Sequence, residues 1–81
     1  MTETEARAKV LDLLEDVTGE PEVREHLDED LFELGLLDSM AAIELLVGLE
    51  DELGVSIAPT EVERSEMNTA NKIAAQVAAR L

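Results

Sequence analysis

Residues 35–54 read Gly-Leu-Leu-Asp-Ser-Met-Ala-Ala-Ile-Glu-Leu-Leu-Val-Gly-Leu-Glu-Asp-Glu-Leu-Gly. Asp38 belongs to the residue types preferred immediately before a helix, because its carboxylate can accept hydrogen bonds from the first backbone N–H groups. Gly54 is the type preferred just past a helix C-terminus. Between them, leucines recur at spacings of three and four. The stretch therefore predicts a helix from Ser39 to Leu53, the best helix in the chain.

This helix is apolar on two sides. At about 100° per residue, one side carries leucines with an alanine beside them, and we predict that it faces the core: Leu45, Leu46, Leu49, Leu53 and Ala42. The opposite side carries apolar residues at i, i+3 and i+7, with acids along its edge: Met40, Ile43, Val47, Glu44 and Asp51. One apolar face is enough to dock a helix in a small bundle. The second face is either covered by a loop or exposed for a partner, and the interleaved acids favour a partner with a basic, apolar surface.

The rest of the chain also predicts helices. Residues 3–17 carry one apolar stripe, Thr60 to Ser65 predict a short helix capped by Thr60, and Asn68 or Thr69 caps a last helix through Leu81. Residues 19–38 predict a long loop with a helical turn from Val23 to Leu27. We expect this loop to lie across the helices, anchored by two apolar residues, Leu31 and Phe32. The 81 residues thus predict a single all-α domain over residues 1–81: a small four-helix bundle with three main helices, a short third helix and a long first loop.

Charge narrows the classes of partner. The formal net charge is -14, and no Lys or Arg occurs between Arg24 and Arg64, where twelve Asp and Glu residues fall. Such a field repels nucleic acid and anionic lipid and attracts basic protein surfaces. Solubility alone is an equally acceptable explanation of the acidity. The same charge disfavours self-association, so we expect a monomer.

Targeting and redox signals are few. No apolar run approaches the ~20 residues that span a membrane, and the acidic residues 1–5 do not resemble a signal peptide. The chain has no cysteine, so it offers no disulfide, thiol nucleophile or Cys-based zinc site. We expect a cytoplasmic protein.

Ser39 is the first residue to consider for chemistry, yet its surroundings argue against catalysis. A nucleophilic serine needs a base, a group that orients the base, and an oxyanion hole. The only histidine, His26, lies in the predicted acidic loop, where a solvated surface role is far more common. No Gly-x-Ser-x-Gly elbow and no metal-binding motif occurs. A small hydrolase that uses Ser39 is therefore the weakest hypothesis, and we expect no catalytic residue and no metal.

Modification of the Ser39 hydroxyl remains. A serine at the start of a helix is accessible to another enzyme and lies near the positive end of the helix dipole. Backbone N–H groups there would stabilise a phosphodiester. A phosphate-linked arm would also supply the thiol that the chain lacks.

The segment Leu31-Phe32-Glu33-Leu34-Gly35-Leu36-Leu37-Asp38-Ser39-Met40, followed by Ile43-Glu44-Leu45-Leu46 and Leu49-Glu50-Asp51-Glu52-Leu53, resembles the acyl carrier protein family. The resemblance covers essentially the whole chain. It implies a four-helix fold and a 4'-phosphopantetheine arm on Ser39, attached from coenzyme A by a phosphopantetheinyl transferase. It further implies that the chain is no enzyme. An adenylate-forming ligase would load an acyl or aminoacyl group on the arm, and an acyltransferase or synthase would remove it.

A finer resemblance is to the D-alanyl carrier proteins of teichoic acid modification. It rests on residues 35–39 and on the stretch from Glu61 to Ile73. Those carriers tend to have an aromatic residue where Met67 stands and a proline where Ala70 stands. The two differences favour a discrete aminoacyl carrier that feeds polyketide or nonribosomal peptide assembly, with the D-alanyl carrier as the alternative.

A different class of function also fits the residues. The two-faced helix would equally serve an acidic adaptor without a prosthetic group that binds a basic helix. In either case we predict Met40, Ile43, Glu44, Val47 and Asp51 as the partner surface.

Overall fold

The computed structural model describes residues 2–81; Met1, the first residue of the predicted domain 1–81, lies outside the described residues. The elements in chain order are α1 (Glu3–Thr18), the 3-10 helix η1 (Pro21–Glu25), α2 (Ser39–Leu53), the 3-10 helix η2 (Arg64–Glu66) and α3 (Ala70–Ala78). No strand occurs within residues 2–81. The prediction of an all-helical bundle with a long first loop is confirmed.

Local signals set the ends of the two longest helices. The Thr2 hydroxyl accepts a hydrogen bond from the Glu5 N–H at 3.2 Å, and the two residues form a capping box that starts α1. At the end of α2, Gly54 adopts φ 68° and donates its N–H to the Glu50 carbonyl at 3.0 Å. That left-handed conformation favours glycine. The predicted helix from Ser39 to Leu53 is confirmed.

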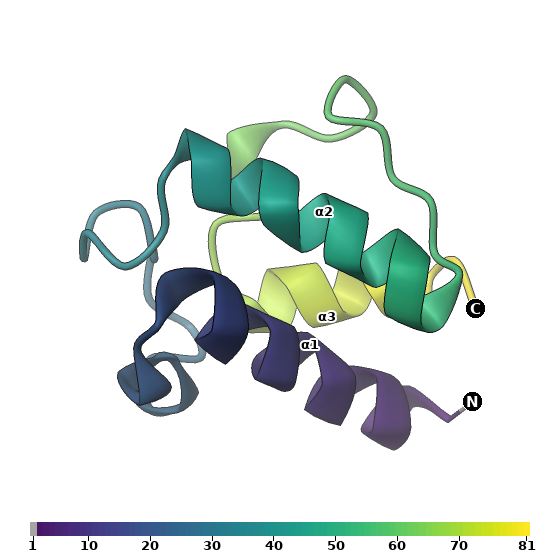
Figure 1. Ribbon diagram of the computed structural model, residues 1–81, viewed down its shortest axis with the longest axis horizontal. Coiled ribbons are helices and arrows are strands. Elements are labelled where there is room, and N and C mark those ends of the chain that lie inside the picture. The colour runs from purple at the N-terminus through teal and green to yellow at the C-terminus, as the bar shows by residue number, and fades with distance from the viewer. Residues whose placement is uncertain (1) are drawn as a thin grey trace.

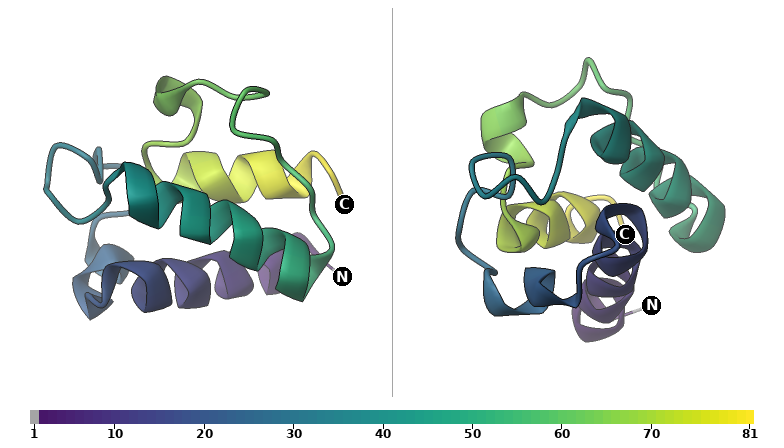
Figure 2. Two further views of the ribbon diagram at one scale, coloured as in Figure 1. Left: turned by 45° about the horizontal axis from the view of Figure 1, so that its top comes forward. Right: turned by 60° about the vertical axis from the view of Figure 1, so that its left-hand side comes forward.

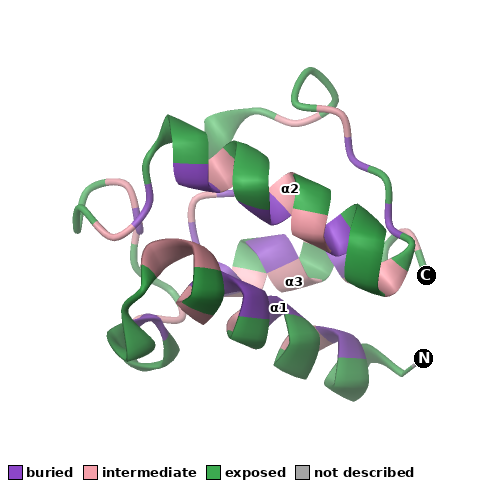
Figure 3. Ribbon diagram, in the orientation of Figure 1, coloured by how far each residue is buried: buried purple, intermediate pink, exposed green. Residues whose placement is uncertain are grey.

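Helix α1 packs against both α2 and α3, and the core lies among the three (Figure 1). Purple segments in Figure 3 mark the helix faces that are buried. The largest fully buried side chains come from all three helices and the first loop: Leu14, Leu31, Leu45, Leu49, Ile73, Val10, Val23 and Val77. On the predicted core face of α2, Leu45 and Leu49 are buried, while Leu46 and Leu53 are half-buried. The alanine buried with them is Ala41, whereas the predicted Ala42 is half-buried.

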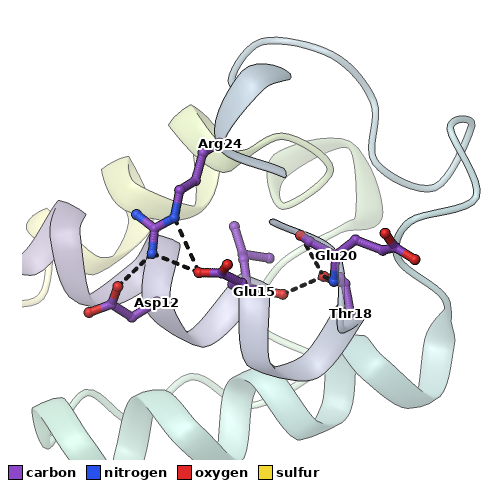
Figure 4. Close-up of polar contacts among 6 residues, drawn as sticks. Asp12, Glu15, Thr18, Glu20 and Arg24 are labelled. Carbon is purple, nitrogen blue, oxygen red and sulfur yellow. Dashed lines mark hydrogen bonds and ion pairs between the residues drawn. The ribbon is translucent and has the colours of Figure 1, made fainter. Parts of the chain in front are cut away.

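The first loop is tied to α1 at its start (Figure 4). Arg24 of η1 reaches back to α1 and pairs with Asp12 at 2.6 Å and with Glu15 at 3.1 Å. The Thr18 hydroxyl donates to the Leu14 carbonyl at 2.7 Å and accepts from the Glu20 N–H at 3.2 Å. These contacts turn the chain sharply after α1 and hold η1 against it.

Further along, the same loop is anchored to the segment that begins α3. Leu31 is fully buried, and its N–H donates to the Asn68 carbonyl at 2.8 Å. The Asn71 N–H donates to the Leu27 carbonyl at 3.0 Å. Phe32 is half-buried against the core. The prediction that Leu31 and Phe32 anchor the loop is therefore confirmed.

The short helices differ from prediction in their positions. The predicted turn from Val23 to Leu27 is instead η1, which starts two residues earlier at Pro21, a residue whose fixed φ suits a first helical turn. The predicted helix from Thr60 to Ser65 is wrong in its start and in its cap, because the capping residue of η2 is Glu63 and not Thr60. Ala58 and Glu61 close a separate turn, in which the Ala58 N–H donates to the Glu61 carboxylate and the Glu61 N–H to the Ala58 carbonyl. Helix η2 then begins at Arg64.

The last helix is shorter than predicted. Helix α3 ends at Ala78 instead of Leu81, because the Arg80 N–H bonds the carbonyl three residues back, at Val77, and tightens the last turn. Its predicted cap is confirmed, since the Thr69 hydroxyl accepts from the Lys72 N–H at 3.0 Å. Within residues 2–81, no helix combines the length and the apolarity needed to cross a bilayer.

Candidate functional site

Ser39 opens α2 and is exposed, and the loop before it explains why. The N–H groups of Leu36 and Leu37 both donate to the Leu31 carbonyl, at 3.0 and 3.1 Å, which closes a tight loop ahead of the helix. Leu37 is buried at 4% exposure and draws the chain into the core one step before the cap. The next two residues, Asp38 and Ser39, therefore emerge at the surface.

Asp38 caps α2 as predicted. It has extended backbone angles, φ -126° and ψ 179°, and its carboxylate accepts from the Ala41 N–H at 2.8 Å. No acceptor within residues 2–81 takes the N–H groups of Ser39 and Met40. The helix thus presents two unpaired donors and the positive end of its dipole beside the Ser39 hydroxyl.

Arg64, which was not among the predicted site residues, also lies beside Ser39. The link between α2 and α3 runs back along α2 and brings η2 near the start of that helix (Figure 2). One guanidinium nitrogen of Arg64, Nη2, lies 3.5 Å from the Ser39 Oγ, and the guanidinium stacks over the Phe32 ring at 4.2 Å from its centroid. The signal was available, since Arg64 is the only Lys or Arg between residues 25 and 71. Its position beside Ser39 could not be predicted from the sequence, because Arg64 lies 25 residues further along the chain.

Asp30 is a further charge in this neighbourhood. Burial by itself would raise its pKa, but hydrogen bonds from the Asn68 side chain and from the N–H groups of Glu33 and Phe32, together with the charge of Arg64, hold the pKa below its usual value. Asp30 therefore stays ionised, and it fixes the loop just ahead of Phe32.

An apolar groove of about 200 Å³ opens beside Ser39, between the start of α2 and the link that carries η2. Ser39 and Arg64 lie on its lining together with apolar side chains: Phe32, Ala42, Leu46, Val62 and Met67. A group attached to the Ser39 hydroxyl could therefore lie against an apolar surface.

The second face of α2 is exposed, so the long loop does not cover it. Met40 is 73% exposed, Ile43 47% and Val47 54%. Glu44 and Asp51 are exposed beside them. The predicted two-sided character of the helix is thus confirmed, and an apolar stripe edged by acids is open to a partner.

Among the described residues, no base lies within hydrogen-bond reach of the Ser39 hydroxyl to activate it as a nucleophile. Within residues 2–81, its only side-chain hydrogen-bond partner is Arg64, whose guanidinium offers hydrogen-bond donors and no acceptor. The sole histidine, His26, pairs through Nδ1 with Glu29 at 2.9 Å, and this hydrogen bond raises its pKa. No group of His, Asp and Glu in the described part of the chain could hold a metal ion. This arrangement suits a hydroxyl that another enzyme modifies.

Comparison with known proteins points in the same direction. A family model described as "Phosphopantetheine attachment site" matches residues 8–77. The chain is 52% identical over 71 residues to the D-alanyl carrier protein of Lactococcus lactis subsp. lactis, covering 88% of this chain and 90% of that protein. It is 48% identical over 68 residues to that of Lacticaseibacillus rhamnosus, covering 84% of each, and 45% identical over 69 residues to that of Bacillus velezensis, covering 85% and 88%.

Proposed function

Since the chain belongs to the family of carrier proteins that bear a phosphopantetheine attachment site, we propose that Ser39 is the residue that carries its arm. The 4'-phosphopantetheine is attached covalently, and the protein acts as a non-catalytic shuttle for the enzymes that load and unload it. The position of Ser39 supports this assignment, because Ser39 is the only one of the three serines that begins an α-helix, and it is exposed there. Ser56 lies in the extended link after α2, and Ser65 lies within η2.

The residues around Ser39 fit a phosphate-linked group. Two free backbone N–H groups and the Arg64 guanidinium are donors suited to phosphate oxygens. When bound, the arm supplies a thiol that holds the cargo as a thioester. The protein contributes placement at the mouth of an apolar groove and a surface that partners can recognise. We also propose that the carrier works in the cytoplasm.

Mass spectrometry tests the attachment. The purified chain is incubated with coenzyme A and a broad-specificity phosphopantetheinyl transferase, and its intact mass is measured. The wild-type chain and the matched control Ser65→Ala should gain one phosphopantetheine, while Ser39→Ala should gain none. An arm that still attaches to Ser39→Ala would overturn the assignment, and no arm on any variant would favour the acidic adaptor.

For the cargo, we propose an aminoacyl group, with D-alanine as the first candidate. This rests on relatives that are D-alanyl carrier proteins and match 84% or more of this chain. A second candidate, another amino acid destined for polyketide or nonribosomal peptide assembly, is favoured by Met67 and Ala70. Of these two, Met67 lines the groove beside Ser39, whereas Ala70 lies at the start of α3.

An aminoacylation assay on the chain that carries the phosphopantetheine arm can distinguish the two candidate cargoes. This chain is offered to an adenylate-forming ligase for D-alanine, and in parallel to amino-acid adenylating enzymes of peptide assembly, with the thioester followed by mass. Faster aminoacylation by the D-alanine ligase supports the first candidate. Preferential loading by a peptide-assembly enzyme overturns it.

We propose the exposed face of α2 as the partner surface. Met40, Ile43 and Val47 supply apolar contacts, and Glu44 and Asp51 meet basic residues of the loading and unloading enzymes. Charges at an interface rim act mainly on the association rate. Reversing Glu44 to Lys should therefore slow aminoacylation at low salt by a factor on the order of ten.

A matched control for that variant is Glu22→Lys, which makes the same charge reversal on η1, away from this face. If both variants slow the reaction equally, the effect comes from net charge, and the α2 face is not the docking surface.

A further inference from the structure

Arg64 ends the most acidic part of the chain, yet it forms no ion pair with any residue that the structure describes. Twelve Asp and Glu residues lie between Arg24 and Arg64. Within residues 2–81, the ion pairs are formed by Arg24, His26 and Arg80, and none involves Arg64. An arginine that pairs with no carboxylate among so many keeps its donors available for another anion.

The side chain is nevertheless held in place. Its guanidinium lies over the Phe32 ring, 4.2 Å from the centroid, a geometry in which the aromatic face attracts the cation. Phe32 is itself fixed, because its N–H donates to the Asp30 carboxylate at 2.9 Å and its ring packs against the core. Within residues 2–81, the guanidinium donates one hydrogen bond, to Ser39, so its other N–H donors remain free for an anion.

The guanidinium nitrogen Nη2 already approaches the Ser39 hydroxyl. The distance from Nη2 to Oγ is 3.5 Å, the long end of the hydrogen-bond range. A phosphate bonded to Oγ would carry two non-bridging oxygens, each two bonds beyond Oγ. The guanidinium fork matches paired phosphate oxygens better than it matches a single hydroxyl.

We propose that Arg64 is the positioning residue for the phosphodiester on Ser39, with Phe32 holding its guanidinium in the required orientation. The inference rests on the proposed attachment of the arm at Ser39. Arg64 offsets the repulsion that the surrounding carboxylates exert on the phosphate, and it fixes the root of the arm at the mouth of the groove that both residues line. The rest of the arm stays free to move between the groove and a partner.

Phosphorus and nitrogen NMR of the loaded chain tests this contact. Intact mass first establishes loading of the wild-type chain, of Arg64→Ala and of Arg64→Lys, so a failure of the Ser39 attachment is seen before any NMR is recorded. In the wild-type chain, loading should shift the Arg64 Nε–Hε signal. In Arg64→Ala, the phosphodiester ³¹P signal should move towards that of the same loaded chain unfolded in urea. Arg64→Lys should lie between the two, because lysine keeps the charge without the fork.

The matched control is Arg24→Ala, another exposed arginine, whose partners are Asp12 and Glu15 on α1. It should leave the ³¹P signal at the wild-type position, and Phe32→Leu should move the signal part of the way. A loaded Arg64→Ala chain with the wild-type ³¹P signal would overturn the proposal. So would an Arg64 Nε–Hε signal that is identical before and after loading, a comparison that needs no variant and does not depend on the folding of one.

Discussion

Replacement of Asp38 by alanine should destabilise the protein through the start of α2. The Asp38 carboxylate accepts from the Ala41 N–H at 2.8 Å, and Ala41 is buried at 8% exposure. With the carboxylate removed, that N–H loses its partner where water has little access. Asp38→Asn is the matched control, since its side-chain oxygen can accept the same hydrogen bond without the charge.

The magnitude follows from the cap. Loss of an Asp, Asn, Ser or Thr cap costs about 1 kcal/mol, within a range of roughly 0.5–2 kcal/mol. For a domain of this size, each 1 kcal/mol lowers Tm by about 4–8 °C. Removal of the negative charge of Asp38 would by itself raise Tm, because it relieves repulsion in a chain of net charge -14. At about 1 M NaCl the Debye length is about 3 Å, so this relief and the helix-dipole term are both suppressed.

The assay is thermal unfolding followed by circular dichroism in about 1 M NaCl. Asp38→Ala should lower Tm by about 4–8 °C, and Asp38→Asn by about 2 °C or less, since asparagine and aspartate cap comparably. If alanine and asparagine lower Tm equally, the effect arises from charge, and the cap does not stabilise α2. An unchanged Tm for Asp38→Ala would refute the reasoning altogether.

Two further predictions concern other elements. The hydrogen bond from Glu29 raises the pKa of His26, so an NMR titration should place that pKa above 6.5, and Glu29→Gln should lower it. The hydrogen bond stabilises the wild-type fold fully below pH 6.5, and this contribution disappears as the pH rises through the folded-state pKa of His26. Equal free energies of unfolding for the wild-type chain and Glu29→Gln at every pH would contradict this prediction. Ala70→Pro should raise Tm by about 2–8 °C, because Ala70 is the first residue of α3 and the extended Thr69 before it accepts a following proline. A lowered Tm would show that the proline ring does not fit at this buried position.

The helices could be predicted from the sequence because their signals are local. Asp38, Thr69 and Gly54 each stand where a cap is needed, and the apolar spacing between them follows the helical period. The short segments were placed less well because their ends depend on contacts of single side chains. Glu61 closes its own turn on Ala58, and this moves the start of η2 to Arg64.

The site could be predicted only where its residues are adjacent in sequence. Asp38 and Ser39, and the exposed apolar face of α2, follow from one continuous helix pattern. Arg64 and Phe32 come from separate segments that the fold brings together at Ser39, and no periodicity encodes that meeting. Their convergence depends on the anchored first loop and on the return of the link between α2 and α3 along α2.

Fragmentation mass spectrometry of the loaded chain tests the attachment at Ser39 most directly. The wild-type chain is loaded with coenzyme A and the transferase, cleaved, and the fragments that contain each of the three serines are sequenced. The arm should be found on the fragment with Ser39 and should leave Ser56 and Ser65 unmodified. An arm on either of those two serines, or on no residue, would contradict the proposal that α2 begins at the attachment site.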